Sequence, residues 1–398
     1  MIEINSYLHR AELCDIIRRW MYDKPEADDG ERLSRIVLFN HEYVRRYMDF
    51  FAMALLRGLH GTDIKTRGIS LKGELKDVLV LNPPYRNDRI DALIRQYRER
   101  PGRFYRETPF QGTLFLKGPD GRESYIGSTR IKRIRRLAEK SARLVSEQIF
   151  RTIQAQAEAL ADERAKRYGL ARSELVTPPE EMIEEFLQAE NRILDQLATG
   201  RQLENMPTLR LNDVAGMKVI VGNDQYATLR GLIDELDLGE VIEEEKHKGI
   251  YNAVNLIVCI RPPRELLLGE RFSEVLNLNK LMQRGVTPDQ ADRQFHDFVG
   301  TGEESVCLEI IAIDYQENLE SEIGRCIHED RIIEQRRGKY YRGHLAKNIE
   351  YLMEYLFSFP SSGRAGIPEL PIKLWNRYLP DYFDQVMKEL FDVDQAGY

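Results

Sequence analysis

The chain has 398 residues, of which 31% are charged, and its formal net charge is −7 at pH 7. This length exceeds what one hydrophobic core usually reaches, so we expect two or three packed units, and the negative charge argues against a surface built for general nucleic-acid binding. Because the sequence has no long apolar run and its start lacks the basic-then-apolar order of a secretory signal, we expect a cytoplasmic protein without membrane contact.

Residues 1–105 are predicted to form a helical N-terminal domain. Apolar residues recur at intervals of three and four positions in LCDIIRRWMY and in HEYVRRYMDFFAMALLRGL, which is typical of amphipathic helices. Pro83 and Pro84 interrupt this pattern, and the segment RERPGRFYRETP is typical of a linker. We therefore place a domain boundary near residue 105.

A hairpin and two long helices are predicted next. Short runs of alternating apolar residues flank Pro119-Asp120-Gly121, a turn sequence in which Gly tolerates positive φ, and this pattern predicts a β-hairpin. Residues 129–168 contain no Pro and no Gly, so we expect one long helix there. Thr177, with Glu180 three residues later, marks the start of a second helix that runs to about residue 197.

Three later segments are rich in β-branched residues and predict the strands of a sheet. These segments are DVAGMKVIVG, IYNAVNLIVCI and SVCLEIIAIDY. A mostly helical stretch over residues 264–300 separates the last two, and the tail from about residue 337 is helical with a loop at SFPSSGRAGIPELP. The predicted fold class is α+β, a mixed β-sheet flanked by helices, with helical N-terminal and C-terminal regions.

The four cysteines lie far apart in the sequence, and none belongs to a CxxC pair that could hold zinc or exchange disulfides. We therefore expect all four to be reduced thiols in or near the core. They are Cys14, Cys259, Cys307 and Cys326.

Five charged residues suggest a phosphoryl-transfer site. Arg130, Lys132 and Lys140 lie around the start of a helix that follows a strand, an arrangement that by itself is more typical of a solvated helix face. Asp213 and Glu309 belong to two separate predicted strands, and carboxylates that meet at one end of a sheet can share a Mg²⁺ ion. Cations and acids together would neutralise and position phosphates, which is most of what phosphoryl transfer requires.

Four motifs in this order resemble those of the RelA/SpoT-type alarmone synthetases. The family's R-x-K motif with a further Lys eight positions later matches Arg130, Lys132 and Lys140. Its D-x-x-G-x-R strand resembles Asp213-Val-Ala-Gly-Met-Lys218, where Lys replaces Arg.

The other two motifs are altered in this chain. The family's G-Y-x-S-x-H resembles residues 249–255, where Tyr251 is retained, one residue is inserted after the Gly, and Asn255 replaces the His. The family's V-E-I-Q-I-R-T resembles residues 308–314, where Glu309 is retained but the Gln and the Arg are not, and the following SEIGRCIH is similar to A-E-I-x-x-x-x-H. The resemblance covers residues 112–330, with the two long helices between the first and second motifs.

The resemblance implies a RelA/SpoT-like nucleotidyltransferase domain over residues 106–335, with a helical insertion at about 141–207 and a helical C-terminal region over 336–398. The implied activity is ATP-dependent transfer of pyrophosphate to the 3′-hydroxyl of a nucleotide, guanine or other, or of a tRNA 3′ end. The implied roles are ATP binding by Arg130, Lys132, Lys140 and Lys218, Mg²⁺ binding and catalysis by Asp213 and Glu309, and acceptor binding by Tyr251, Asn255 and His247.

Other interpretations stay open at this point. The altered acceptor motifs also fit a catalytically inactive nucleotide-sensing or partner-binding module on the same fold, and a helical scaffold without a nucleotide role is a third interpretation. His296-Asp297 resembles the metal-binding pair of alarmone hydrolases, but no upstream His occurs in a fitting helical context. The sequence has no GxxxxGK[ST] loop, so we expect any bound ATP to be held without a P-loop.

Overall fold

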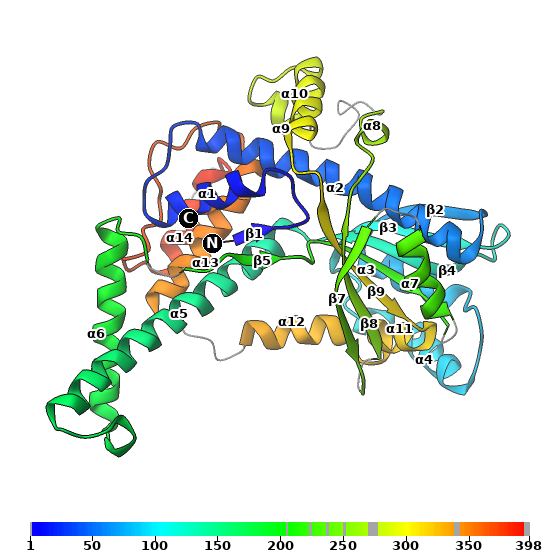
Figure 1. Cartoon of the computed structure of the whole chain (residues 1–398). Coiled ribbons are helices and arrows are strands. Elements are labelled where there is room, and N and C mark those ends of the chain that lie inside the picture. The colour runs from blue at the N-terminus through cyan, green and yellow to red at the C-terminus, as the bar shows by residue number, and fades with distance from the viewer. Residues whose placement is uncertain are drawn as a thin grey trace.

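In the computed structural model, a seven-stranded mixed sheet forms the centre of the fold, with helices against both of its faces (Figure 1). The structure describes residues 2–203, 206–222, 225–235, 239–249, 252–269, 278–337 and 343–393. The predicted α+β class, a mixed sheet flanked by helices, is therefore confirmed. In the described part of the chain, no helix combines the length and apolar character needed to cross a membrane.

The strands of the main sheet lie in the order β2-β3-β4-β6-β9-β8-β7. Only the pair β6 and β9 is parallel, and the other neighbours are antiparallel. A second, two-stranded parallel sheet joins β1 to β5. The bounds are β1 Ile2–Ile4, β2 Ile64–Leu71, β3 Pro109–Lys117, β4 Ser124–Ile131, β5 Leu209–Leu211, β6 Ala215–Ile220, β7 Gly239–His247, β8 Ala253–Ile260 and β9 Val306–Ile313.

The two faces of the main sheet belong to two hydrophobic clusters. Helices α2 (Asp29–His60) and α7 (Gln225–Glu235) pack on one face, and their apolar residues join the first cluster. Helices α3 (Lys72–Leu81), α4 (Asp88–Glu99) and α11 (Tyr315–Leu319) belong to the second cluster, which covers one end of the opposite face. The other end of that second face is left for the polar residues described below.

The remaining helices lie around the N-terminal segment and to one side of the sheet (Figure 1). The long helices α5 and α6 form a hairpin that projects from the body, and α13 packs along α5. The bounds are α1 Arg10–Met21, α5 Ile134–Arg167, α6 Pro179–Ala198, α8 Arg264–Leu267, α9 Leu278–Met282, α10 Pro288–Thr301, α12 Ile327–Arg337, α13 His344–Ser358 and α14 Pro380–Leu390.

Several predicted boundaries differ from the structure. The helix predicted from Thr129 begins at Ile134, because residues up to Ile131 continue strand β4 and pair with β6. Residues 64–71 were included in a helical region but form β2, which pairs with β3 across the predicted boundary at residue 105. Strands β1, β5 and β7 were also not predicted.

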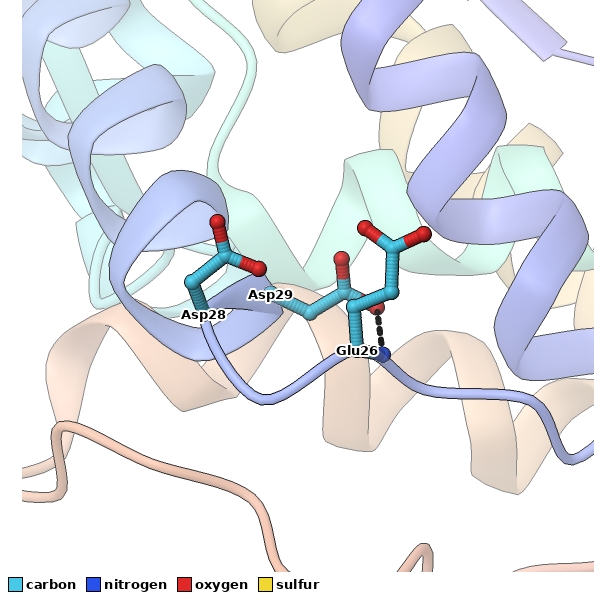
Figure 2. Close-up of side chains that lie close together, drawn as sticks. All are labelled: Glu26, Asp28 and Asp29. Atoms are coloured by element: carbon cyan, nitrogen blue, oxygen red, sulfur yellow. Dashed lines mark hydrogen bonds between the residues drawn. The ribbon is translucent and has the colours of Figure 1, made fainter.

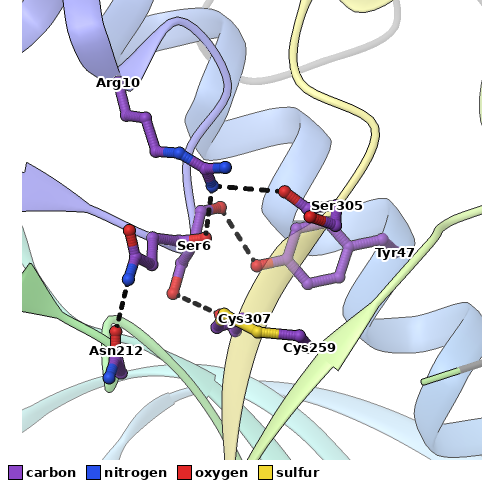
Figure 3. Close-up of a disulfide and its surroundings, with 8 residues drawn as sticks. Ser6, Arg10, Tyr47, Asn212, Cys259, Ser305 and Cys307 are labelled. Carbon is purple, nitrogen blue, oxygen red and sulfur yellow. Dashed lines mark hydrogen bonds between the residues drawn. A yellow bond between two sulfur atoms is a disulfide. The ribbon is translucent and has the colours of Figure 1, made fainter. Parts of the chain in front are cut away.

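Two of the four cysteines are not reduced. Cys259 of β8 and Cys307 of β9 lie opposite each other in register and form a disulfide (Figure 3). Cys14 and Cys326 are free thiols, as expected. The prediction failed for the first pair because it compared positions in the sequence, whereas the strand register places two residues 48 positions apart side by side.

Candidate active site

The candidate site begins with a row of residues that crosses the sheet. Arg130 of β4, Gly216 of β6 and Glu309 of β9 are neighbours in register, so their side-chain positions point to the same face. Arg130 Nη2 lies 3.5 Å from Glu309 Oε2. A Cβ atom on Gly216 would lie 3.4 Å from Arg130 Nε and 3.6 Å from Glu309 Oε2. Glycine on the central strand therefore leaves the space in which the other two side chains meet.

Asp213 lies between β5 and β6 and binds the two predicted lysines. Its Oδ2 is 2.8 Å from Lys132 Nζ and also accepts a hydrogen bond from Lys140 Nζ, which comes from α5. Burial by itself would raise the pKa of Asp213, but the two ammonium groups outweigh it and hold that pKa well below its ordinary value. Burial, with the nearby Arg130, lowers the pKa of Lys132 to about 8.

Lys140, Asp213 and Glu309 line one cavity of about 270 Å³, and Arg130 and Lys132 pair with these acids without being among its lining residues. Asp213, Glu309 and Asn255 line it, and in the described part of the chain each has one buried oxygen that accepts no hydrogen bond, namely Asp213 Oδ1, Glu309 Oε2 and Asn255 Oδ1. The cavity lining consists of Lys140, Arg143, Leu144, Arg210, Leu211, Asn212, Asp213, Glu243, Glu245, Asn255, Ile257 and Glu309. The structure thus brings the three predicted cations and the two predicted acids into one region.

The N-terminal segment holds the two acids in place (Figure 3). Asn5 Nδ2 donates to Asn212 Oδ1 at 2.7 Å, directly before Asp213. Ser6 Oγ donates to the carbonyl of Cys307 at 2.7 Å, two residues before Glu309. Asn5 and Ser6 therefore fix both acid-bearing segments relative to each other. Sequence reasoning missed them because each bond joins residues about two or three hundred positions apart.

Lys218 lies on the same face of the sheet, in the register row that continues through Ile311 to Asn255. Its Nζ donates to Asn318 Oδ1 at 2.8 Å and to Glu322 Oε1 at 3.0 Å. Glu322 also accepts from Lys72 Nζ at 2.6 Å. Burial lowers the pKa of Lys218. Lys218 thus belongs to a buried charge network and is not among the residues that line the cavity.

The residues predicted for the acceptor are only partly described. Asn255 lines the cavity, and His247 lies on the same face at the end of β7, with its Nε2 3.6 Å from Glu245 Oε2. Tyr251 lies outside the described residues. Glu243 and Glu245 of β7 also line the cavity, although nothing in the sequence reasoning selected them.

An acidic cluster near the start of α2 is the only group of three or more potential metal ligands among the described residues (Figure 2). It contains Glu26, Asp28 and Asp29. Asp29 is fully buried, and its oxygens accept from Trp20 Nε1 at 2.9 Å, from the Glu26 amide at 3.0 Å and from Arg19. These bonds already occupy the buried carboxylate and fix the start of the helix, so the cluster stabilises the fold locally.

A larger cavity of about 480 Å³ lies between α5 and α6. Its lining contains none of the predicted site residues, and its charged groups, Arg192, Arg201 and Asp195, lie on a helix and on the segment that follows it. We therefore place the candidate site in the smaller cavity, where cations, carboxylates and unbonded oxygens meet. Comparisons with protein-family models, with curated proteins and with solved structures found no match for this chain.

Proposed function

We propose that the chain transfers pyrophosphate from ATP to the 3′-hydroxyl of a nucleotide or of a tRNA 3′ end, on a RelA/SpoT-like nucleotidyltransferase core. One observation carries the proposal. Lys132 and Lys140 bind Asp213, Arg130 pairs with Glu309, and Lys140, Asp213 and Glu309 line a single cavity, although these residues come from different strands, a helix and loops. Such a set of charges suits a reaction in which positioning and charge neutralisation supply most of the catalysis.

The cationic residues supply the donor side of the site. Arg130 can present two parallel N–H groups to a phosphate, and Lys132 and Lys140 supply compact positive charges. Both lysines bind Asp213. ATP phosphates would compete with that carboxylate for the same ammonium groups, so Asp213 keeps the lysines in place for the donor.

The carboxylates fit a Mg²⁺ ion, which prefers oxygen ligands. Asp213 Oδ1 is buried and accepts no hydrogen bond within the described residues, and Glu309 Oε2 accepts none there either, although Arg130 Nη2 lies 3.5 Å from it, so both acids offer an oxygen to a cation. Asp213 and Glu309 would hold the ion, which when bound would offset negative charge on the transferred phosphates.

Glu309 is the candidate general base. Its carboxylate would take the proton of the acceptor 3′-hydroxyl as the hydroxyl oxygen attacks the β-phosphorus of ATP. The bond between the β-phosphorus and the oxygen that bridges to the α-phosphorus breaks, and AMP leaves with that oxygen. Arg130, 3.5 Å from the carboxylate, orients Glu309 and lies where charge develops on the transferred group.

A second candidate function is a catalytically inactive nucleotide-sensing or partner-binding module on the same fold. The placement of Lys218 favours it, because this residue, which takes the position of a family arginine, binds Asn318 and Glu322 in the core. A site that keeps Arg130, Lys132 and Lys140 but lacks the positive charge of Lys218 can bind ATP without transferring pyrophosphate.

The two functions are separated by incubating the purified chain with γ-labelled ATP, Mg²⁺ and a panel of nucleotides and tRNA. Labelled acceptor together with AMP supports the transferase, and Glu309→Gln is expected to reduce the rate at least about 100-fold, as for loss of a general base. Glu304→Gln is the matched control, since Glu304 is exposed and lies two residues before the start of β9.

ATP binding without AMP release for every acceptor would favour the sensor. A chain that binds no ATP in the presence of Mg²⁺ would contradict both functions.

A further inference from the structure

Strand β7 lies at the edge of the sheet and carries a run of acidic residues next to the cavity. Its pairing with β8 shifts by one residue between Val241 and Glu243, which is a β-bulge at Ile242. After the shift Glu243 lies opposite Ile257 and Glu245 lies opposite Asn255. Bulges re-aim side chains in this way next to functional sites.

The bulge decides which residues of β7 face the cavity. If the register before the bulge continued unchanged, Ile242 and Glu244 would lie on the face that carries Glu309. With the bulge, Glu243 and Glu245 lie on that face and line the cavity, whereas Glu244 lies on the opposite face, 3.0 Å from Lys246 Nζ and 3.9 Å from Arg230 of α7. The local backbone therefore places two carboxylates in the site.

The cavity is consequently divided by charge into two walls. The sheet wall consists of Glu243, Glu245 and Glu309 with Asn255 and Ile257, and no cation is among the described residues that line it. The opposite wall, from α5 and β5, carries Lys140, Arg143 and Arg210. On the proposed function, the donor phosphates would lie at the cationic wall with Lys140 and near Arg130, which pairs with Glu309 at the inner end of the acidic wall, and Glu243 and Glu245 would be left to the acceptor.

We propose that the acceptor is a nucleoside unit without a 5′-diphosphate or 5′-triphosphate, which Glu243 and Glu245 bind through its ribose hydroxyls or base amino groups. This inference rests on the proposed function and names the substrate class of that same site. The polar groups on the sheet wall are the three carboxylates and Asn255, whose Oδ1 accepts no hydrogen bond within the described residues, so acceptors predominate there. Such a wall binds O–H and N–H donors and repels a polyphosphate, because like charges at close range are unfavourable.

The experiment measures AMP release from ATP and Mg²⁺ with the wild-type chain and matched acceptors. Guanosine and adenosine, their 5′-monophosphates and a short RNA with a free 3′-hydroxyl form one group, and GDP, GTP and ADP form the other. We expect kcat/KM to be at least about tenfold higher for members of the first group. Within the first group, comparing the RNA with the free nucleosides shows whether the preferred acceptor is the 3′ end of an RNA or a free nucleoside.

The double variant Glu243→Lys/Glu245→Lys tests the residues directly. It is expected to shift the preference toward the 5′-polyphosphates by about tenfold or more. Glu244→Lys is the matched control, because it makes the Glu-to-Lys substitution once, on the residue between the two but on the other face of the strand, and it is expected to leave the preference unchanged. Circular dichroism checks that each variant is folded, and Glu243→Gln with Glu245→Gln replaces the lysine pair if it is not.

The outcomes distinguish this inference from the proposed function. AMP release with GDP or GTP as the preferred acceptor would overturn the inference and leave the transferase standing. If no acceptor yields AMP, the proposed transferase activity is refuted. Calorimetric titration with guanosine and with GDP then tests whether the acidic wall is a nucleoside site. Binding of guanosine that is lost in the double variant would support the acidic wall as a nucleoside site, and binding of GDP alone would refute it.

Discussion

Glu322→Gln is expected to lower the free energy of unfolding by about 3 kcal/mol, the scale seen when one partner of a buried ion pair is removed. The Glu322 side chain is 1% exposed and accepts from Lys72 at 2.6 Å and from Lys218 at 3.0 Å. Glutamine keeps the shape of the side chain but removes its charge, which takes the carboxylate partner from the buried Lys218 and leaves Lys72 with only the more distant Glu329, 3.9 Å away. Urea denaturation followed by circular dichroism measures the loss.

The matched control is Glu320→Gln, two residues earlier in the same helical turn. Glu320 pairs with the half-exposed Arg89, with Arg89 Nη2 2.8 Å from Oε2, and loss of a pair near the surface costs at most about 1 kcal/mol. Equal losses in the two variants would refute the buried network. A Glu322→Gln variant of full stability that binds ATP more weakly would instead assign Lys218 to the nucleotide.

The pH dependence of stability gives a second test of the ion pairs of Glu322. Burial alone would raise the pKa of Glu322, but Lys72 and Lys218 hold it well below the ordinary value of 4.5. Because the folded pKa is lowered, the stabilisation is complete above pH 4.5 and is lost as the pH falls through the lowered value. The difference in the free energy of unfolding between wild type and Glu322→Gln should therefore become smaller only at acidic pH, below 4.5.

Two further predictions concern the site. Gly216→Val is expected to reduce AMP release at least about tenfold without unfolding the chain, because its methyl groups would separate Arg130 from Glu309. Gly216→Ala is the control, since it adds only a Cβ atom in ordinary van der Waals contact. Equal activity of the two variants would contradict this geometry. Since burial lowers the pKa of Lys132 to about 8, the ammonium is charged below that pH, and affinity for a non-hydrolysable ATP analogue should fall up to about tenfold from pH 7 to pH 9. Lys132→Arg should remove most of this pH dependence in the same titration.

The central strands could be predicted from the sequence because they are buried on both faces. Strands β6 and β9 appear as nearly continuous apolar runs interrupted by single polar residues, and Lys218 and Glu309 are among those interruptions. The edge strands β2 and β7 lack this pattern. Their exposed faces carry charges, as in the acidic run of β7, so neither alternation nor apolar content marks them as strands.

The charged residues of the site were selected from spacing, but their partners depend on register. The proximity of Arg130 and Glu309 follows from the alignment of β4, β6 and β9, and this alignment cannot be read from any one strand. The disulfide and the hydrogen bonds of Asn5 and Ser6 also join residues far apart in the sequence, so no single segment predicts them. The bulge in β7 is a further case, because one extra residue reverses which glutamates face the cavity.

The charges of the site explain why donor and metal would bind together rather than separately. Lys132 and Lys140 neutralise Asp213, and Arg130 lies beside Glu309, so each acid has a cationic neighbour. Phosphates that recruit the three cations leave both acids uncompensated in a partly buried site, which is unfavourable unless another cation replaces them. A divalent ion restores that balance, whereas the same ion arriving first would meet the charges of Lys132 and Lys140. On the proposed function, the arrangement would therefore favour the metal–nucleotide complex over either component alone.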